Sequence, residues 1–410
     1  MAEKKLLHLA REDGRLPHPR LFFLAIVLSL IFMDPFHWSP VAGRNYRPVK
    51  LDGIAPYKEI MASWRKDNQS RLRNGKLQFA GEVFGPESIE FDPKGRGPYT
   101  GLADGRVVRW MGDNVGWETF AVVNPNWSEK ECANGVNSTT RKQHPKESFC
   151  GRPLGLRFDK RTGDLYIADA YYGLMVVGPD GGVATSLTSE VEGTPILFAN
   201  DLDIHSNGSI FFTDTSARYD RRNHVFILLE GEATGRLLRY DPTTKSTSVV
   251  VSGLTFANGV QISKDETFLL VAETTKCRIM RYWLEGPRAG QLELYANLPG
   301  FPDNVRINDK GNFWVAIDCC RTRTLEVFSH HPWMRNFYFR LPLKLNILGK
   351  MVGMKMYTVI ALFDNEGKTI DVLEDRQGEV MRLVSEVREV DGKLWIGTVA
   401  HNHIATFSYS

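Results

Sequence analysis

A six-residue phrase recurs six times between residues 87 and 390, and this repeat constrains the fold more than any other feature. Each copy opens an alternating apolar strand, which leads through an Asp-, Asn- or Gly-containing turn to a second strand. A small sheet cannot bury both of its faces alone, so six copies closed into a ring predict an all-β fold, a six-bladed β-propeller over residues 76–410. Residues 76–80 are expected to join the last blade to the first. The copies begin at Glu87, Leu154, Asn200, Asn258, Asp303 and Ser385.

The N-terminus differs in character from the repeats. Residues 1–20 form a basic region that is expected to stay cytoplasmic, and residues 21–33 are apolar and uncharged. This run is shorter than the roughly twenty residues of a membrane span and is typical of a signal peptide or a signal anchor. The only candidate cleavage site, at residues 41–43, is weak, so both readings stay open. Residues 34–75 are expected to form a linker or stalk.

Two features predict that the body of the protein lies in the secretory pathway, in the lumen of the endoplasmic reticulum, the vacuole or outside the cell. Cys132 and Cys150 bracket a polar segment that suits a disulfide in an oxidising compartment. Cys277 is expected to be buried and reduced, and the adjacent Cys319 and Cys320 are expected to point to opposite faces of a strand and not to pair. Four sequons predict glycosylation, at Asn68, Asn126, Asn137 and Asn207.

The net charge of +3 is close to balance, and no basic patch with interleaved aromatic residues occurs. Nucleic acid is therefore not an expected partner.

The first residues of the six phrases are equivalent positions at the mouths of the innermost strands. Around a six-fold axis they are expected to converge, so that two carboxylates and two carboxamides share one site. An oxygen-only donor set with two negative charges favours Ca²⁺, with Glu87, Asn200, Asn258 and Asp303 as ligands. Asp201 and Asn304 are adjacent and could add contacts. The alternative is a hydrogen-bonded ring around a water-filled tunnel.

A second set of ionisable residues follows the second strands of the blades. We expect them either to face a pocket or to lock turns within the blades. Asp303 and His401 are the candidate general bases, because one would lie beside the metal and the other titrates near neutrality. The second set comprises Asp169, with Tyr171 and Tyr172 beside it, Asp214, Glu273, Asp318, His401 and His403.

An insertion at residues 331–357 separates the last two blades. It is aromatic and basic and carries no acidic residue before residue 357. It is expected to be a lid over the pocket or a contact with the membrane, and the alternative is a helix packed on the side of the propeller.

Several motifs resemble the strictosidine synthase-like family from about residue 80 to the end, among them those starting at Tyr282, Cys150, Ala168 and Leu394. The segments 84–91 and 399–406 resemble the plant anther branch of that family. The resemblance implies a role in tapetum and pollen exine formation and in male fertility, and it supports the Cys132–Cys150 bridge. True strictosidine synthases carry a catalytic glutamate where this chain has Ser385, so that condensation is not expected.

The proposed metal ligands resemble the calcium quartet of paraoxonases and gluconolactonase-like enzymes. This resemblance implies a calcium-dependent lactonase or esterase acting on a hydrophobic small molecule. Leu154 stands where paraoxonases carry a catalytic histidine. The alternative is therefore a non-catalytic binding or scaffold propeller that calcium stabilises.

Overall fold

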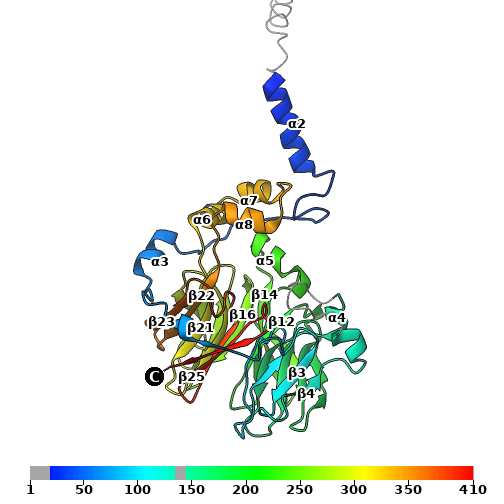
Figure 1. Cartoon of the computed structure of the whole chain (residues 1–410), viewed down its shortest axis with the longest axis vertical. Helices are drawn as coiled ribbons and strands as arrows, with labels where there is room; N and C mark the ends of the chain where they lie inside the picture. The colour runs from blue at the N-terminus through cyan, green and yellow to red at the C-terminus, as the bar shows by residue number, and fades with distance from the viewer. Residues whose placement is uncertain (1–18, 134–144, 410) are drawn as a thin grey trace, which may run out of the picture.

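The structure, a computed structural model, describes residues 19–133 and 145–409 and confirms the six-bladed β-propeller (Figure 1). Each blade is a four-stranded sheet, antiparallel except that β8 of the first blade runs parallel to β4. The first blade contains β2 (Tyr99–Gly101), β3 (Arg106–Trp110), β4 (Trp117–Val122) and β8 (Gly182–Val183). The second contains β5 (Pro153–Phe158), β6 (Leu165–Asp169), β7 (Gly173–Val177) and β9 (Thr185–Thr188). The third contains β12 (Ala199–Ile204), β13 (Ile210–Asp214), β14 (Gly235–Asp241) and β15 (Ser246–Leu254).

The remaining blades repeat this order. The fourth contains β16 (Ala257–Ile262), β17 (Phe268–Glu273), β18 (Arg278–Trp283) and β19 (Leu292–Asn297). The fifth contains β20 (Phe301–Ile307), β21 (Phe313–Cys319), β22 (Tyr357–Phe363) and β23 (Thr369–Asp375). The sixth contains β24 (Glu386–Val390), β25 (Lys393–Gly397), β26 (Ile404–Ser408) and β1 (Lys76–Gln78). A separate hairpin is formed by β10 (Glu190–Val191) and β11 (Thr194–Pro195).

The ring closes through β1, as the sequence predicted. Its residues pair antiparallel with β26, Lys76 opposite Thr406 and Gln78 opposite Ile404. This pairing covers an edge of the last sheet and joins the two ends of the propeller, which leaves fewer unpaired backbone groups.

The innermost strands pack side by side around the axis, with β12 between β5 and β16, and β20 between β16 and β24. The close contact between β16 and β20 requires a glycine at position 259, in the fourth phrase, because a Cβ on Gly259 would lie 2.5 Å from Asn304 Cα. Between blades, alternate strand residues form apolar clusters; Leu270, Val305 and Val359 belong to the one between the fourth and fifth blades. The cores therefore lie between neighbouring blades, and the axis is left to polar residues.

Helices cover one end of the propeller (Figure 1). They come from two insertions at equivalent places, between the second and third strands of the third and fifth blades. The first insertion holds η3 (Arg221–Asn223) and α5 (His224–Glu230), and the second holds α6 (Arg323–His330), α7 (Pro332–Phe339) and α8 (Leu345–Met351). We call these five elements the cap. The prediction that the insertion 331–357 separates the last two blades was wrong, because it lies within the fifth blade, between β21 and β22. It also begins earlier, since Thr322 caps α6 by accepting a hydrogen bond from Leu325 N at 3.3 Å.

The segment expected as a linker or stalk is packed on the propeller instead. Val41 and Tyr46 are buried in an apolar cluster with the cap, and Leu72 is buried beside the last two blades. Burial removes these apolar side chains from water, which stabilises the packed segment relative to a free linker. Among the described residues, the helices outside the cap are α2 (Pro19–Met33), α3 (Tyr57–Ser63), η1 (Arg71–Asn74), η2 (Glu129–Ala133) and α4 (Glu147–Cys150).

The apolar segment 21–33 lies in α2, which projects from the cap end of the propeller (Figure 1). Among the described residues, no helix is both long and apolar enough to cross a membrane. Residues 1–18 lie outside the described part.

The cysteines follow the sequence predictions in two cases of three. Cys132 and Cys150 form a disulfide with a Cα–Cα distance of 5.6 Å, and Cys277 is buried and free. The prediction that Cys319 and Cys320 do not pair was wrong, because the structure joins them by a disulfide. Their sulfur atoms therefore lie on the same side of the chain and not on opposite faces of the strand. Of the sequons, Asn68, Asn126 and Asn207 are exposed, and Asn137 lies outside the described residues.

Candidate functional site

A cavity of about 440 Å³ lies on the propeller axis beneath the cap. All six positions that open the repeated phrases line it, so the equivalent strand mouths do meet at one place. Asp318, at the end of β21, lines it as well. The floor of the cavity is thus formed by Glu87, Leu154, Asn200, Asn258, Asp303, Asp318 and Ser385.

A β-bulge at the start of the inner strands directs these side chains inward. In the fourth blade, Ala257 pairs with Glu273 and Val260 with Val271, so Asn258 lies in the irregular step between them. The same step occurs around Asn200 and around Asp303. A bulge bends the strand and turns a side chain out of the normal alternation, which is how these three blades present Asn200, Asn258 and Asp303 to the axis.

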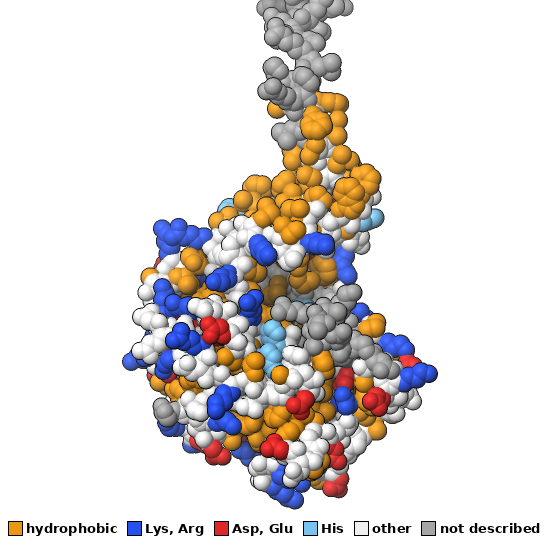
Figure 2. Space-filling view, in the orientation of Figure 1, with side chains coloured by type: hydrophobic (Ala, Val, Ile, Leu, Met, Phe, Trp, Pro, Cys, Tyr) orange, Lys and Arg blue, Asp and Glu red, His pale blue; other side chains and the backbone are white. Residues whose placement is uncertain are grey.

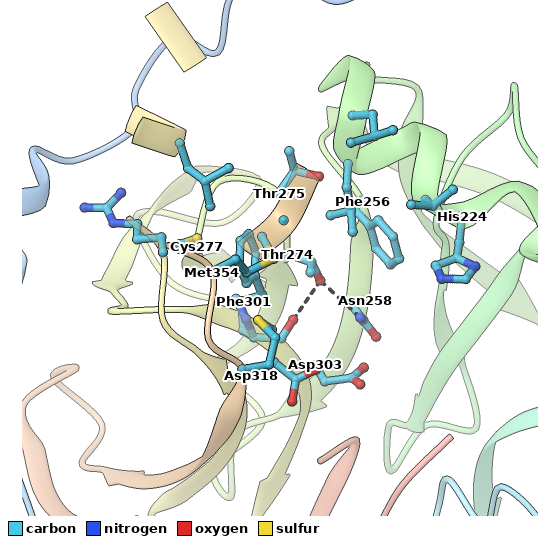
Figure 3. Close-up of a pocket in the computed structure, with 18 of the residues that line it drawn as sticks. His224, Phe256, Asn258, Thr274, Thr275, Cys277, Phe301, Asp303, Asp318 and Met354 are labelled. Carbon is cyan, nitrogen blue, oxygen red and sulfur yellow. Dashed lines mark hydrogen bonds between the residues drawn. The ribbon is translucent and has the colours of Figure 1, made fainter. Parts of the chain in front are cut away.

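The two asparagines are held with their oxygens unpaired. Asn200 Nδ2 donates to Thr215 Oγ1 at 3.1 Å, and Asn258 Nδ2 donates to Thr274 Oγ1 at 3.1 Å. Figure 3 shows the second of these contacts and the labelled side chains around it. Both Oδ1 atoms, and Glu87 Oε2, are buried without a hydrogen-bond partner. Three buried acceptors at one place are costly unless a donor or a cation joins them.

The three carboxyl groups of the floor have raised pKa values, because they are buried. Burial raises the pKa of Glu87 to about 7, with Asp201 and Glu386 adding to the rise against the attraction of Arg152 and Arg221. Burial raises the pKa of Asp303 well above its usual range, and the charges of Glu87 and Asp318 raise it further. Burial also raises the pKa of Asp318 to about 7. A positive charge on the axis would relieve this repulsion.

The donor set of this floor fits a hard cation. Among the described residues, no group of three or more His, Cys, Asp or Glu side chains could hold a metal ion. A cation at the axis would therefore depend on the two carboxamide oxygens as much as on Glu87 and Asp303. That mixture of neutral and charged oxygen atoms is the chemistry that Ca²⁺ takes in proteins.

The residues next to the ring form a buried ionic layer on the other side of the inner strands. Arg306 pairs with Asp201 at 2.7 Å and also with Glu386, and all three side chains are fully buried. Asn304 Nδ2 donates to Glu386 Oε2 at 3.4 Å. Asp201 and Asn304 are therefore absent from the cavity lining and instead hold the inner strands together. Alternation along a strand explains this, since neighbours of an inward side chain point the other way.

Glu386 does not replace the missing catalytic glutamate. Its Oε1 accepts a hydrogen bond from Ile89 N at 2.9 Å, its Oε2 accepts one from Ser88 Oγ at 3.0 Å, and only its neighbour Ser385 lines the cavity.

Of the two roles predicted for the second set of ionisable residues, three carboxylates take the turn-locking one. Asp169 accepts from Arg152 N at 2.7 Å, Asp214 from Phe198 N at 3.0 Å, and Glu273 from Thr255 N at 2.9 Å. Each therefore ties the end of a second strand to the approach of the inner strand, and none of them lines the cavity. Asp318 makes the corresponding bond, from Val384 N at 3.0 Å, but differs because it also reaches the cavity.

His401, predicted as a candidate general base, does not face the cavity either. It lies in the turn between β25 and β26, where its carbonyl accepts from Gly85 N at 2.8 Å and its ring stacks on His403 at 5.3 Å. Neither histidine lines the cavity, so neither is placed to act on a ligand there. Tyr171 is outside it too, with its hydroxyl donating to Glu147 Oε1 at 2.6 Å.

The roof of the cavity is mainly apolar, and sequence reasoning missed it except for the insertion 331–357. Phe328, Phe339 and Leu345 of the cap line it, with Phe198 and Phe256 below them. Three arginines, Arg221, Arg321 and Arg335, also line it. The sequence did contain one signal for the first insertion of the cap, the length of the connection between β13 and β14. Residues 215–234 separate these two strands, whereas residues 274–277 connect the equivalent strands of the next blade.

Residues 45–57, which we call the strap, complete the roof. Val49 N donates to Glu230 O at 2.8 Å in α5, and Leu51 N donates to Ser329 O at 2.9 Å in α6. Leu51 and Ile54 line the cavity. The strap therefore connects the two insertions of the cap across the cavity.

The fold and the site define a six-bladed β-propeller with an axial, oxygen-lined pocket. Two family models match the chain, "Strictosidine synthase" at residues 200–287 and "Strictosidine synthase-like, N-terminal" at residues 70–110. The Arabidopsis thaliana protein STRICTOSIDINE SYNTHASE-LIKE 13 is 64% identical over 408 residues, which covers 99% of this chain and 98% of that protein. The chain belongs to the strictosidine synthase-like family.

Two further relatives and one solved structure are similar to the chain at lower sequence identity. STRICTOSIDINE SYNTHASE-LIKE 3 of Arabidopsis thaliana is 44% identical over 92% of this chain and 95% of its own length. The adipocyte plasma membrane-associated protein of Salmo salar is 36% identical over 83% of this chain and 79% of its own length. A solved gluconolactonase from Xanthomonas campestris superposes with a TM-score of 0.52 at 14% identity, covering 82% of this chain and 90% of that one, which shows the shared fold alone.

Proposed function

We propose that this protein is a calcium-dependent hydrolase of the ester or lactone type, acting on a hydrophobic small molecule. The observation that carries the proposal is the set of buried, unpaired oxygens of Glu87, Asn200 and Asn258 at the floor of an apolar cavity. The floor suits a cation, and the roof suits an apolar substrate that enters with its carbonyl group toward the axis.

Glu87, Asn200, Asn258 and Asp303 would hold the calcium ion. When bound, calcium supplies positive charge that polarises a carbonyl oxygen and stabilises the charge that develops on it. The side chains of Thr215 and Thr274 fix the two amides, so the floor needs little rearrangement to receive the ion.

The proton acceptor would be a carboxylate of the floor. Asp303 and Asp318 both line the cavity, so a water molecule between them and the substrate would give its proton to one of these carboxylates while it attacks the carbonyl carbon. When the C–O bond of the ester or lactone then breaks, the same carboxyl group would return the proton to the departing oxygen. Phe198, Phe256 and Phe339 would bind the apolar part of the substrate and exclude other water. His401 has no role in this mechanism, because it does not line the cavity.

One observation favours a second function, a binding propeller that calcium stabilises without catalysis. Leu154, at the position of the paraoxonase histidine, is buried among Phe198, Ile227 and Phe256. It leaves that side of the floor without a base. Condensation of an amine with an aldehyde is not proposed, because Glu386 is turned away from the cavity and paired with Arg306.

The test uses the full chain in detergent. Calcium binding is measured by calorimetry, and turnover is measured on aryl esters and lactones with aliphatic tails, with and without EGTA. We expect turnover that EGTA abolishes and calcium restores, and its loss in Glu87→Gln and in Asp303→Asn. The control is Glu82→Gln, an exposed residue close in sequence. A melting temperature that falls with EGTA while no substrate turns over would support the binding propeller, and hydrolysis that survives Glu87→Ala with Asp303→Ala would refute the calcium mechanism.

The cellular setting remains a proposal. The exposed sequons and the Cys132–Cys150 disulfide support a secretory-pathway location in the endoplasmic reticulum, the vacuole or outside the cell. The role in anther development and pollen exine formation is supported only by the family resemblance. Sensitivity of the plant protein to endoglycosidase H would test the first, and the pollen wall of a loss-of-function line would test the second.

A further inference from the structure

Helix α7 is apolar on two opposite faces. Its inner face is buried and places the apolar Phe339 in the cavity roof, next to the buried side chain of Arg335. Its outer face carries Trp333 and Phe337, four residues apart, and Trp333 is 70% exposed. A helix on the surface of a soluble domain normally carries polar residues on its outer face, so this second apolar face has no partner within the described chain.

Helix α8 repeats the arrangement. Leu348 and Val352 are buried, and Leu345 lines the cavity. On the outside, Ile347 and Met351 are again four residues apart and exposed, Met351 by 60%. Residues four apart lie on one face of a helix, so each pair forms a short apolar ridge.

A third exposed apolar element follows α2. The rings of Phe36 and Trp38 stack with centroids 4.9 Å apart, and Trp38 is 66% exposed. Asp34 fixes the turn between them and the helix by accepting from Trp38 N at 2.9 Å. Figure 2 shows hydrophobic side chains running without a break from α2 over the end of the molecule that the cap covers. Aromatic side chains in such a position are typical of the membrane–water interface.

Basic residues accompany this surface. Residues 331–356 include Lys344, Lys350 and Lys355, all exposed, and no acidic residue. Figure 2 shows blue Lys and Arg side chains below the hydrophobic end of the molecule. An apolar face flanked by cations matches a bilayer that contains anionic lipids, since the apolar groups enter the interface while the cations remain at the phosphates.

We propose that the cap docks on an anionic lipid bilayer through a surface made of Phe36, Trp38, Trp333, Phe337, Ile347 and Met351. The inner faces of the same helices roof the cavity, so the docked protein holds its cavity directly under the membrane surface. Docking through this surface does not depend on hydrolase activity.

The test is fluorescence quenching of the full chain reconstituted with vesicles of phosphatidylcholine and phosphatidylserine, in which part of the lipid is brominated. Lipid bromine quenches only tryptophans at the bilayer. We expect the quenched fraction to fall in Trp333→Phe and in Trp38→Phe. The matched control is Trp395→Phe, because β25 runs from Trp395 toward the cavity-lining Val399 and so places Trp395 at the opposite end. These conservative changes keep the fold, so a lost signal reports position.

A second pair of variants tests the charge. Lys344→Glu with Lys350→Glu should remove the extra Trp333 quenching that phosphatidylserine gives over phosphatidylcholine alone, while Lys160→Glu with Lys245→Glu, in exposed turns between strands, should not. The proposal is overturned if Trp333→Phe is quenched as strongly as the wild type. It is also overturned if the chain sediments in detergent as a dimer that Trp333→Gln dissociates, because the surface would then bind a second copy.

Discussion

The hydroxyl of Thr274 fixes the orientation of the Asn258 amide. It accepts from Asn258 Nδ2 at 3.1 Å and donates to Pro302 O in the next blade at 2.7 Å (Figure 3). Since the hydroxyl proton is used by the carbonyl, only the NH₂ end of the amide can face Thr274, and the oxygen is left toward the axis. Thr215 does the same for Asn200, donating to Ala257 O at 2.8 Å.

This arrangement predicts that Thr274→Val weakens calcium binding. Without the acceptor the amide loses its preferred orientation, and loss of one hydrogen bond of roughly 1 kcal/mol corresponds to about a five- to tenfold higher Kd. Calorimetric titration measures it. Thr274→Ser retains the hydroxyl and should bind like the wild type. Equal affinity of the Val and Ser variants would contradict the role of the threonine.

Replacing Arg306 should strongly destabilise the propeller. Arg306→Met leaves the buried carboxylates of Asp201 and Glu386 without their cation, which typically costs about 3–5 kcal/mol. Urea unfolding followed by circular dichroism measures the loss. The control is Arg96→Met, which breaks the half-exposed pair with Asp92 and should cost less than about 1 kcal/mol. Similar midpoints for both variants would show that the inner ionic layer is not required.

The strap should open when its buried anchor is made polar. Leu51→Gln places an amide in the apolar roof, at a cost of roughly 2 kcal/mol, so the strap should detach about thirty times more often. The readout is the rate of trypsin cleavage after Lys50, which is exposed. Val49→Gln, an exposed change in the same segment, is the control. Cleavage of Leu51→Gln at the wild-type rate would mean that Leu51 does not hold the strap.

The calcium-free protein should lose stability as the pH rises toward neutrality. Burial raises the pKa of Asp318 to about 7 from an unfolded value of 3.8, so the folded state binds the proton more tightly. Its contribution is fully present below about pH 4 and is lost as the pH rises through about 7, amounting to at most about 4 kcal/mol. Melting temperatures in EGTA between pH 5 and pH 8 should fall in the wild type and change less in Asp318→Asn. If the melting temperatures of the wild type and of Asp318→Asn fell equally with pH, Asp318 would not be the cause of the lost stability.

The sequence determined the propeller and the membership of its axial ring. Strand alternation and turn residues are local properties, and six registered copies leave closure into a ring as the arrangement that buries every blade. The positions that open each phrase could therefore be placed on the axis without coordinates, and the closing role of residues 76–78 followed from the same argument.

The sequence could not decide which other ionisable groups face the cavity. Asp169, Asp214, Glu273 and Asp318 occupy equivalent places at the ends of the second strands, yet only Asp318 reaches the cavity. His401 has suitable chemistry, but the turn carries it outside the lining. Such differences arise from the path of each turn over a few residues, which a repeat pattern does not encode.

Only the tertiary structure assigned the cap and the strap. Residues 34–75 have the composition of a linker, and their burial depends on contacts with α5 and α6, which lie far away in the sequence. The sequence pattern predicts the alternation of each strand, because that alternation depends on residues close together in the chain. The covering of the axial floor by an apolar roof results from long-range packing between two insertions and the N-terminal segment, and that packing exists only once the propeller has closed.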